Sequence, residues 1–499
     1  MTPNRTLLSL STVLAVLLYA IDTTVANVAL PVIQGSLSAT REQVAWVLTA
    51  YLIASAIALP ALGAVEARLG LRRSFILSVA GFGVSSVLCG LAPNIETLVV
   101  ARFLQGLCGA ALLPLSQTAM QGVYPPNQLS KVFALFGMGV MVGPVIGPWL
   151  GGWLTDNFGW RAVFYINMPV VMLSLMGMLA TLRGAPSEAP RKFDRLGYSL
   201  LVVCVLMLQL AIDRGQQLDW FDSPEIVLEV SIGLIAGYMF VVHSTSTERP
   251  LFAGGLRRDR NLVLGVAMSV LVGWPFMGSM VLLPQFLQEV QGYTVASAGV
   301  LMAPRGIGLI LSMLVLSRVG SSIDLRAAFA FGCVMNTMGL LAFAWLPADV
   351  PADVLTGWLL LQGMGLGLIF VPLNTLTFIT LPAEYRTEGA ALMVLSRNLG
   401  SSLGVAMLVR GISTDAGANF DRLREIAHVP AADDLSSFAW ILQMAHREAL
   451  VIAYSNQYVL LALMPAILLP FVWLMRRNVT TGTLSGPSDR PVPRDEVLH

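Results

Sequence analysis

The chain is organised by long apolar segments that alternate with short polar ones. Each segment has the length of about 20 residues that an α-helix needs to cross the hydrocarbon core of a bilayer. The candidate spans are approximately residues 7–30, 43–64, 74–92, 95–120, 129–154, 162–182, 196–213, 225–246, 261–288, 297–319, 325–346, 354–380, 389–411 and 452–475. The pattern predicts an all-α polytopic membrane protein with about fourteen transmembrane helices.

Composition agrees with this prediction and excludes several function classes. Of the 499 residues, 56% are hydrophobic and 12% are charged, and the mean hydropathy is +0.74. The formal net charge of +1 gives no electrostatic reason to expect nucleic-acid binding. The polar loops contain no paired His/Cys ligands, phosphate loop or nucleophile motif. We therefore expect no metal, no cofactor and no enzymatic activity.

Basic residues are concentrated in alternate loops. They cluster within residues 68–73, 183–195 and 249–260, whereas the opposite loops hold scattered arginines, most of them in one long segment. Cytoplasmic loops of membrane proteins carry an excess of Lys and Arg. With an even number of spans, this distribution places both termini in the cytoplasm.

The first span contains one acidic residue, Asp22, in an otherwise uncharged apolar run. A charged side chain near the middle of such a helix costs about 2.5 to 3.5 kcal/mol on insertion scales. Protonation removes most of this cost, so the proton on Asp22 should be coupled to whatever else occupies the same cavity. The alternative is a structural acid paired with a nearby polar group. We expect Thr23 and Asn27, within about 140° of arc from Asp22, to line the cavity side of this helix.

The fourth span carries a polar stripe on one helical face. Gln105, Gly106 and Gly109 lie three, four and seven residues after Arg102, so the four residues share one face, and Gln117 extends the stripe. We expect Arg102 to modulate the proton affinity of a neighbouring carboxylate, and Gln105 and Gln117 to line the substrate cavity. The alternative for Arg102 is a side chain that reaches towards the membrane surface.

The fifth span combines glycines four residues apart with two prolines. Such glycines form a ridge that lets another helix approach closely, and the prolines favour a bend. We expect tight packing and hinging here, with an ordinary packing seam as the alternative. The residues are Gly139, Gly143, Pro144, Gly147, Pro148, Gly151 and Gly152.

The short loop after the second span is expected to act in gating. It contains Gly63, Arg68, Gly70, Arg72 and Arg73, and the similar loop at residues 318–326 hints at two related halves that rock about a central cavity.

Four further charged residues lie within or near spans. We interpret Arg305 and Arg397 as intramembrane cations that stabilise packing or gates, and Asp213 and Glu289 as interfacial charges, with proton or substrate binding as the alternative.

Residues 412–450 form a polar outer segment with apolar residues at helical spacing. It is expected to form short helices on the outer face, either as a docking surface for a partner or as an ordinary ordered loop on the membrane. Residues 476–499, rich in Gly, Ser, Pro and charge, are expected to be a disordered cytoplasmic tail.

These residues in this order resemble the major facilitator superfamily, and more narrowly its fourteen-span drug:proton antiporter family of the EmrB/QacA type. The resemblance covers nearly the whole chain. It is carried by Asp22 to Pro31 (DTTVANVALP), Arg102 to Gly109 (RFLQGLCG), Gly143 to Gly152 (GPVIGPWLGG), Trp160 to Pro169 (WRAVFYINMP), Ile212 to Ser223 (IDRGQQLDWFDS), Leu283 to Gly292 (LPQFLQEVQG), Pro304 to Gly308 and Arg397 to Gly404 (RNLGSSLG).

The resemblance implies the major facilitator fold, with two six-helix bundles and two extra helices inserted between them. The bundles would be residues 1–182 and 261–475, and residues 183–260 would hold the inserted pair. It also implies export of hydrophobic or amphipathic toxic compounds across the inner membrane in exchange for protons. In Gram-negative cells it further implies a periplasmic adaptor and an outer-membrane channel.

One position departs from the family pattern. The gating loop usually carries an acid before its first arginine, but this chain has Ala67 there and Glu66 one position earlier. The charge contact that latches the gate in the family is therefore not assured here.

The sequence leads to one function and two rivals. We expect a proton-coupled multidrug exporter in which Asp22 binds the proton, Arg102 tunes it and broad apolar walls hold lipophilic substrates. A rival is an exporter of one endogenous metabolite, such as a fatty acid or a siderophore. A membrane sensor or integral membrane enzyme is disfavoured because the chain has no catalytic motif or soluble domain.

Overall fold

The computed structural model describes residues 5–182, 193–248, 250–345, 350–426 and 435–477. Within these ranges the regular elements are all helical. They are α1 Arg5–Ser36, α2 Arg41–Leu69, α3 Leu71–Leu91, α4 Ile95–Gly109, α5 Leu112–Val123, η1 Pro126–Gln128, α6 Leu129–Phe158, α7 Ala162–Tyr165, α8 Asn167–Thr181, α9 Arg195–Gly215, η2 Trp220–Asp222, α10 Pro224–Ser246, α11 Gly254–Arg258, α12 Arg260–Glu289, α13 Val295–Leu301, α14 Ala303–Val319, α15 Leu325–Ala344, α16 Ala352–Phe378, η3 Ala383–Tyr385, α17 Arg386–Ile426 and α18 Leu435–Val472.

The helices confirm the expected all-α membrane fold. Thirteen described segments are long and apolar enough to cross a membrane. The helix α6, 30 residues long with side chains that are only partly described, occupies the remaining predicted span. The fourth, sixth and tenth predicted spans each consist of two helices in succession, namely α4 with α5, α7 with α8, and α13 with α14.

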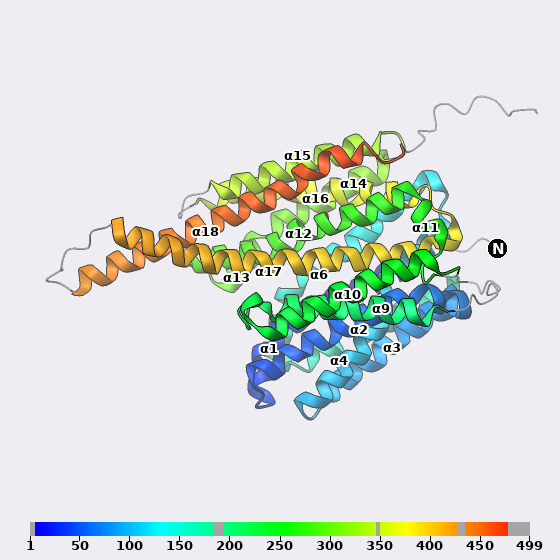
Figure 1. The fold of residues 1–499 in the computed structure, drawn as a ribbon, viewed down its shortest axis with the longest axis horizontal. Helices are drawn as coiled ribbons and strands as arrows, with labels where there is room; N and C mark the ends of the chain where they lie inside the picture. The colour runs from blue at the N-terminus through cyan, green and yellow to red at the C-terminus, as the bar shows by residue number, and fades with distance from the viewer. Residues whose placement is uncertain (1–4, 183–192, 249, 346–349, 427–434, 478–499) are drawn as a thin grey trace, which may run out of the picture.

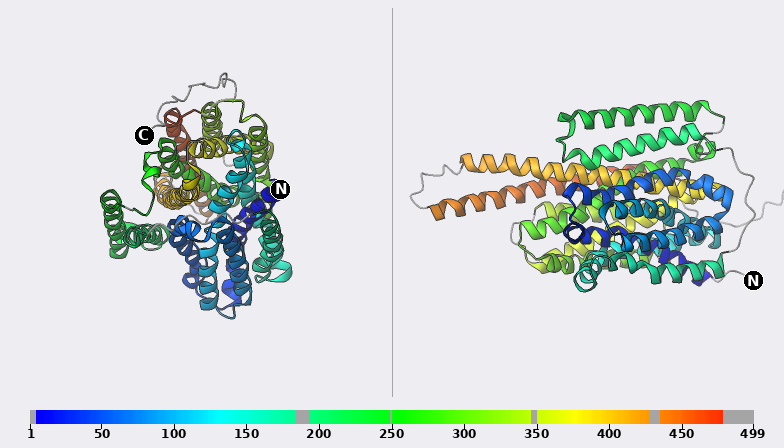
Figure 2. Two further views of the ribbon diagram at one scale, coloured as in Figure 1. Left: turned by 90° about the vertical axis from the view of Figure 1, so that its right-hand side faces the viewer. Right: turned by 90° about the horizontal axis from the view of Figure 1, so that it is seen from below.

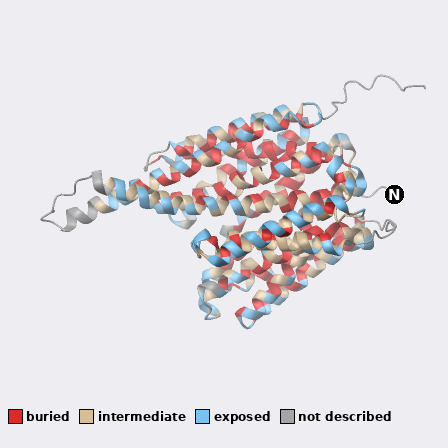
Figure 3. Ribbon diagram, in the orientation of Figure 1, coloured by how far each residue is buried: buried red, intermediate tan, exposed pale blue. Residues whose placement is uncertain are grey.

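The helices pack as two bundles, which lie one above the other in Figure 1. In the N-terminal bundle α1 packs on α6 and α8, and α2 packs on α4. In the C-terminal bundle α12 packs on α17, while α14 and α15 pack on α16. Buried residues lie where these helices meet, as Figure 3 shows.

The inserted helices α9 and α10 lie side by side on one flank (Figure 2, right). The helix α9 touches both bundles: the Tyr198 hydroxyl donates to the carbonyl oxygen of Ile57 on α2 at 3.0 Å, and the Gln209 amide donates to Ser402 on α17 at 2.9 Å. The helix α10 packs mainly on α9 and is the less buried of the two.

Several contacts between the bundles gather at the end that the charge pattern assigns to the cytoplasm. Arg386 donates to the carbonyl oxygen of Gln121 at 3.0 Å, and the hydroxyls of Thr387 and Thr118 lie 3.0 Å apart. The rings of Phe133 and Phe378 stack with centroids 5.6 Å apart, as do those of Phe136 and Phe370 at 6.3 Å. Towards the opposite end, the helices of the N-terminal bundle diverge from those of the C-terminal bundle (Figure 1). The bundles are therefore joined at this first end.

The outer segment at residues 412–450 differs from the prediction of short helices on the membrane. Instead, α17 and α18 continue beyond the bundle as long helices of 41 and 38 residues (Figure 1). The helices α17 and α18 pack on each other, and in their extensions the Phe420 and His446 rings lie 5.8 Å apart in an edge-to-face contact. Residues 478–499 of the predicted tail lie outside the described residues.

Asp194 fastens the ends of the inserted helices. Its carboxylate accepts hydrogen bonds from the backbone N–H groups of Gly197 at 2.9 Å and Leu251 at 3.1 Å, and it pairs with His243 at 3.0 Å. Burial alone would raise the pKa of Asp194, but these bonds together hold the pKa below its ordinary value of 3.8.

We expect Asp194→Ala to lower the free energy of unfolding by about 1 kcal/mol at neutral pH, because a helix N-cap is lost. A group with a lowered folded-state pKa stabilises the protein above its ordinary pKa, so the difference from wild type should shrink as the pH falls below 3.8. Thermal unfolding of the solubilised protein at neutral and acidic pH measures both effects. Ser199→Ala, which removes an exposed hydroxyl bonded to its own helix, is the matched control.

Candidate functional site

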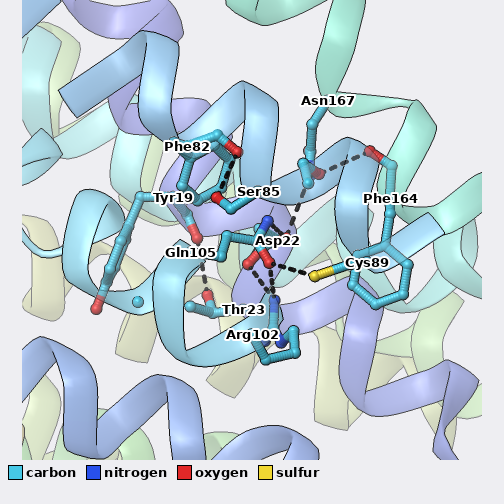
Figure 4. Close-up of polar contacts among 12 residues, drawn as sticks. Tyr19, Asp22, Thr23, Phe82, Ser85, Cys89, Arg102, Gln105, Phe164 and Asn167 are labelled. Atoms are coloured by element: carbon cyan, nitrogen blue, oxygen red, sulfur yellow. Dashed lines mark hydrogen bonds and ion pairs between the residues drawn. The ribbon is translucent and has the colours of Figure 1, made fainter. Parts of the chain in front are cut away.

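Asp22 lies at the centre of a buried polar cluster in the N-terminal bundle (Figure 4). Its side chain is 1% exposed. Arg102 Nη1 lies 2.8 Å from Oδ2, Gln105 Nε2 donates to Oδ1 at 2.9 Å, and Asn167 Nδ2 donates to the same oxygen at 3.1 Å. Three helices, α1, α4 and α8, therefore meet at one carboxylate.

Arg102 is fixed in this cluster on several sides. Its Nη1 also donates to Gln105 Oε1 at 2.7 Å, and its Nε donates to the carbonyl oxygen of Val47 at 3.3 Å. The guanidinium carbon lies 4.6 Å from the centroid of the Tyr51 ring. With its side chain 1% exposed, Arg102 does not reach the membrane surface, so the interfacial alternative is wrong and Asp22 is its acidic partner.

A second set of hydrogen bonds positions the amide groups. Asn167 Nδ2 donates to Ser86 Oγ at 3.0 Å, and Ser86 in turn donates to the carbonyl oxygen of Phe164 at 2.8 Å. Sequence reasoning placed Asn167 only within a resembling motif and missed both residues as members of the site. The available signal was a buried amide at the start of an apolar helix, because a polar side chain at membrane depth needs a partner.

The cluster can hold an ionised carboxylate without water. One cation and two amide donors face its two oxygens, which compensates for the loss of solvation. A proton on Asp22 would remove the charge that pairs with Arg102 and would weaken this contact between α1 and α4. This is the chemistry that a proton-driven conformational change requires.

The glycines of α6 form a ridge against α1. A methyl group on Gly143 would overlap the backbone of Ala20, and one on Gly147 would overlap the Thr24 hydroxyl. The Cβ of an alanine at Gly139 or Gly151 would lie 3.1 to 3.2 Å from valine atoms of α1. The ridge therefore lets α6 pack closely against α1, the helix that carries Asp22. Nothing lies within 4 Å of the corresponding point on Gly152, and the side chains of Pro144 and Pro148 lie outside the described part of the structure.

The residues predicted to line a substrate cavity lie in different surroundings. Gln105 belongs to the Asp22 cluster. Thr23 is partly buried and donates to carbonyl oxygens of its own helix, whereas Asn27 is exposed. Gln117 is 1% exposed, and neither polar atom of its amide has a hydrogen-bond partner among the described residues. Their role in substrate binding stays a prediction.

The predicted gating loop is a single residue, Gly70, between α2 and α3. Its φ of +77° lies in a region that an L side chain rarely adopts, which explains why glycine stands there. Arg68 lies in the last turn of α2, and Arg72 and Arg73 lie in the first turn of α3. Gly63, two turns before Gly70, packs directly against Glu388 of α17, which brings the other bundle to this loop.

The sequence profile of the Major Facilitator Superfamily matches residues 12–405. The chain belongs to this superfamily. It is 30% identical over 482 residues to the multidrug export protein EmrB of Escherichia coli, covering 93% of this chain and 94% of that protein. It is also 34% identical over 411 residues to the fatty acid resistance protein FarB of Neisseria gonorrhoeae, covering 80% of this chain and 79% of that protein.

Solved structures of distant superfamily members share the fold of this Major Facilitator Superfamily chain. The human organic anion transporter MFSD10 matches with a TM-score of 0.59 at 14% identity, covering 93% of this chain and all of that one. The Escherichia coli fucose:proton symporter FucP matches with a TM-score of 0.57 at 12% identity, covering 95% of this chain and 99% of that one. These matches support the fold alone.

The glycine ridge gives a paired test in this superfamily member. We expect Gly143→Ala to reduce folded yield and transport severely, because its methyl group would overlap the backbone of Ala20. Gly152→Ala should behave like wild type, because that position is open. Size-exclusion profiles and cellular drug tolerance of the two variants measure the difference. Equal behaviour of both would contradict the ridge.

Proposed function

We propose that the protein is a proton-coupled exporter of hydrophobic or amphipathic toxic compounds across the inner membrane, with both termini in the cytoplasm. The observation that carries the proposal is the buried ion pair of Asp22 and Arg102, because ionisable residues inside a membrane bundle are costly and mark proton relays in pumps and transporters. The names of the relatives EmrB and FarB, both matched over most of the chain, support export or resistance as the biological role.

The proposed cycle alternates two states. With the cytoplasmic ends of the bundles in contact, the drug leaves outward and Asp22 takes up a proton. When the bundles rock to open the cytoplasmic end, the proton leaves, Arg102 pairs again with the carboxylate and a new drug molecule binds. The ridge of α6 keeps α1 seated while the halves move. Proton entry down its gradient thus drives the drug out.

Two further elements belong to the proposal. In a Gram-negative cell, a periplasmic adaptor and an outer-membrane channel would take the compound onwards, and the protruding ends of α17 and α18 are the natural place for an adaptor to dock.

The second candidate function is export of one endogenous metabolite, favoured by the likeness to a fatty acid resistance protein. Resistance profiling of a deletion strain, set beside analysis of its medium, separates the two functions.

We expect Asp22→Asn to abolish substrate-driven proton movement in proteoliposomes, because an amide carries no exchangeable charge at this site. Proton flux is measured with a pH-sensitive dye trapped in the vesicles, after addition of a lipophilic substrate. Glu96→Gln is the matched control, because Glu96 is an exposed acid in the first turn of α4.

The single variant leaves Arg102 buried without its partner, a change that can cost about 3 to 5 kcal/mol and impair folding. The double variant Asp22→Asn with Arg102→Met removes both charges and should fold but remain uncoupled. Undiminished proton exchange by either folded variant would refute the assignment of Asp22.

A further inference from the structure

A small cavity lies between the two bundles, and its lining contains a single charged residue. The cavity has a volume of about 10 Å³, roughly the space of one water molecule. It is bounded by α6 of the N-terminal bundle and by α12, α14, α16 and α17 of the C-terminal bundle. The lining residues are Met141, Val272, Phe276, Leu309, Leu366, Phe370 and Arg397.

Arg397 has no acidic counterpart in this cavity. Among the described residues, no Asp or Glu forms an ion pair with it within 4.0 Å. Its guanidinium carbon lies 5.6 Å from the centroid of the Phe370 ring. Gly273 lets α12 pack closely on the backbone of α17 at Arg397, so the position of this residue is fixed. Arg397 therefore presents to a largely apolar space a positive charge that no described acid pairs with.

Arg305 adds a second positive charge behind the same wall. It is 5% exposed, and its Nη2 donates to Ser279 Oγ at 2.8 Å and to the carbonyl oxygen of Phe276 at 3.4 Å. Its Nη1 has no hydrogen-bond partner among the described residues. Phe276 and Leu309 line the cavity, and Arg305 donates to the carbonyl oxygen of Phe276 and lies one turn before Leu309 on α14, so its charge lies next to the cavity wall. Neither charge is neutralised by a described acid.

We infer that this cavity is the binding site for the acidic group of an amphipathic organic anion, with Arg397 as its receptor. A planar guanidinium can donate two parallel hydrogen bonds to a carboxylate or a sulfonate, and the aromatic and aliphatic walls suit a ring system or hydrocarbon chain. The inference rests on the proposed export function and specifies its substrate class. The cavity is too small for such a ligand in the present conformation, so binding belongs to a state in which the bundles have moved apart on one side.

A lipophilic cation fits this site poorly. The described lining offers no carboxylate, and Arg397 would repel a second positive charge. The acid of the N-terminal bundle, Asp22, is buried and already accepts hydrogen bonds from Arg102, Gln105 and Asn167. The electrostatics of the cavity therefore select anionic over cationic ligands of the same size.

Three probes that share a naphthalene ring but carry a negative, no or a positive charge test the inference: 2-naphthoate, its methyl ester and (2-naphthylmethyl)trimethylammonium. Binding of each to the full-length protein in nanodiscs is measured by titration calorimetry at neutral pH. We expect wild type to bind the carboxylate most tightly. Arg397→Gln should weaken carboxylate binding at least tenfold and ester binding less than threefold, and Arg397→Lys should recover part of the loss.

Arg410→Gln is the matched control. Arg410 lies on the same helix as Arg397, is exposed and stacks over Trp220 rather than lining the cavity. This variant should bind all three probes as wild type does. Unchanged carboxylate binding by Arg397→Gln, equal weakening of all three probes, or a wild-type preference for the ammonium probe would each overturn the inference.

Transport separates this inference from the proposed function. Proteoliposomes with an imposed pH gradient report whether wild type moves each probe. If wild type transports the ester and transports the ammonium probe faster than the carboxylate, the inferred substrate class is wrong and the export function is supported. Arg397-dependent carboxylate binding, with no probe moved by the gradient, sinks the proposed function and leaves the binding site intact.

Discussion

The structure depends on a carboxylate held inside the membrane by one arginine and two amides. A lone Asp22 would be expensive in a bilayer, and a lone Arg102 would be more so because it cannot shed its proton. Their 2.8 Å contact, completed by Gln105 and Asn167, joins α1, α4 and α8 through polar groups. Apolar side chains alone would orient these helices weakly, because they pack about as well against lipid as against each other. In the proposed cycle, protonation of Asp22 breaks the same contact, so the interaction that orders the bundle is also the one that would rearrange it.

Two tyrosine rings lie next to this ion pair. The ring of Tyr51 lies 4.6 Å from the guanidinium carbon of Arg102 and 6.5 Å from the ring of Tyr19. Tyr19 also lies one turn before Asp22 on the same helix. In the proposed cycle, a movement of α1 that follows protonation would therefore carry Tyr19 along with Asp22 and change its contact with Tyr51 of α2.

The sequence predicted the fold well because a membrane imposes a simple rule on it. Apolar runs of helix length have few alternative structures in a bilayer, so the spans followed from pattern alone. The pairing of Asp22 with Arg102 was also within reach, since two buried opposite charges must find partners. The contribution of Asn167 was not, because one amide in an apolar helix does not indicate which helix it faces. The continuation of α17 and α18 beyond the bundle was missed for a similar reason: helical spacing predicted helices but not that two spans would extend without a break.

The unbroken course of α17 has a mechanical consequence. This one helix has Glu388 against Gly63 in its first turn, passes Arg397 at the cavity and ends beyond the bundle, a length of about 60 Å for 41 residues. A rod of that length turns a small angular change at its base into a large sweep at its tip. A protein bound to the tip of α17 would therefore move when the other end of the helix moves, because the stiff helix transmits the displacement directly.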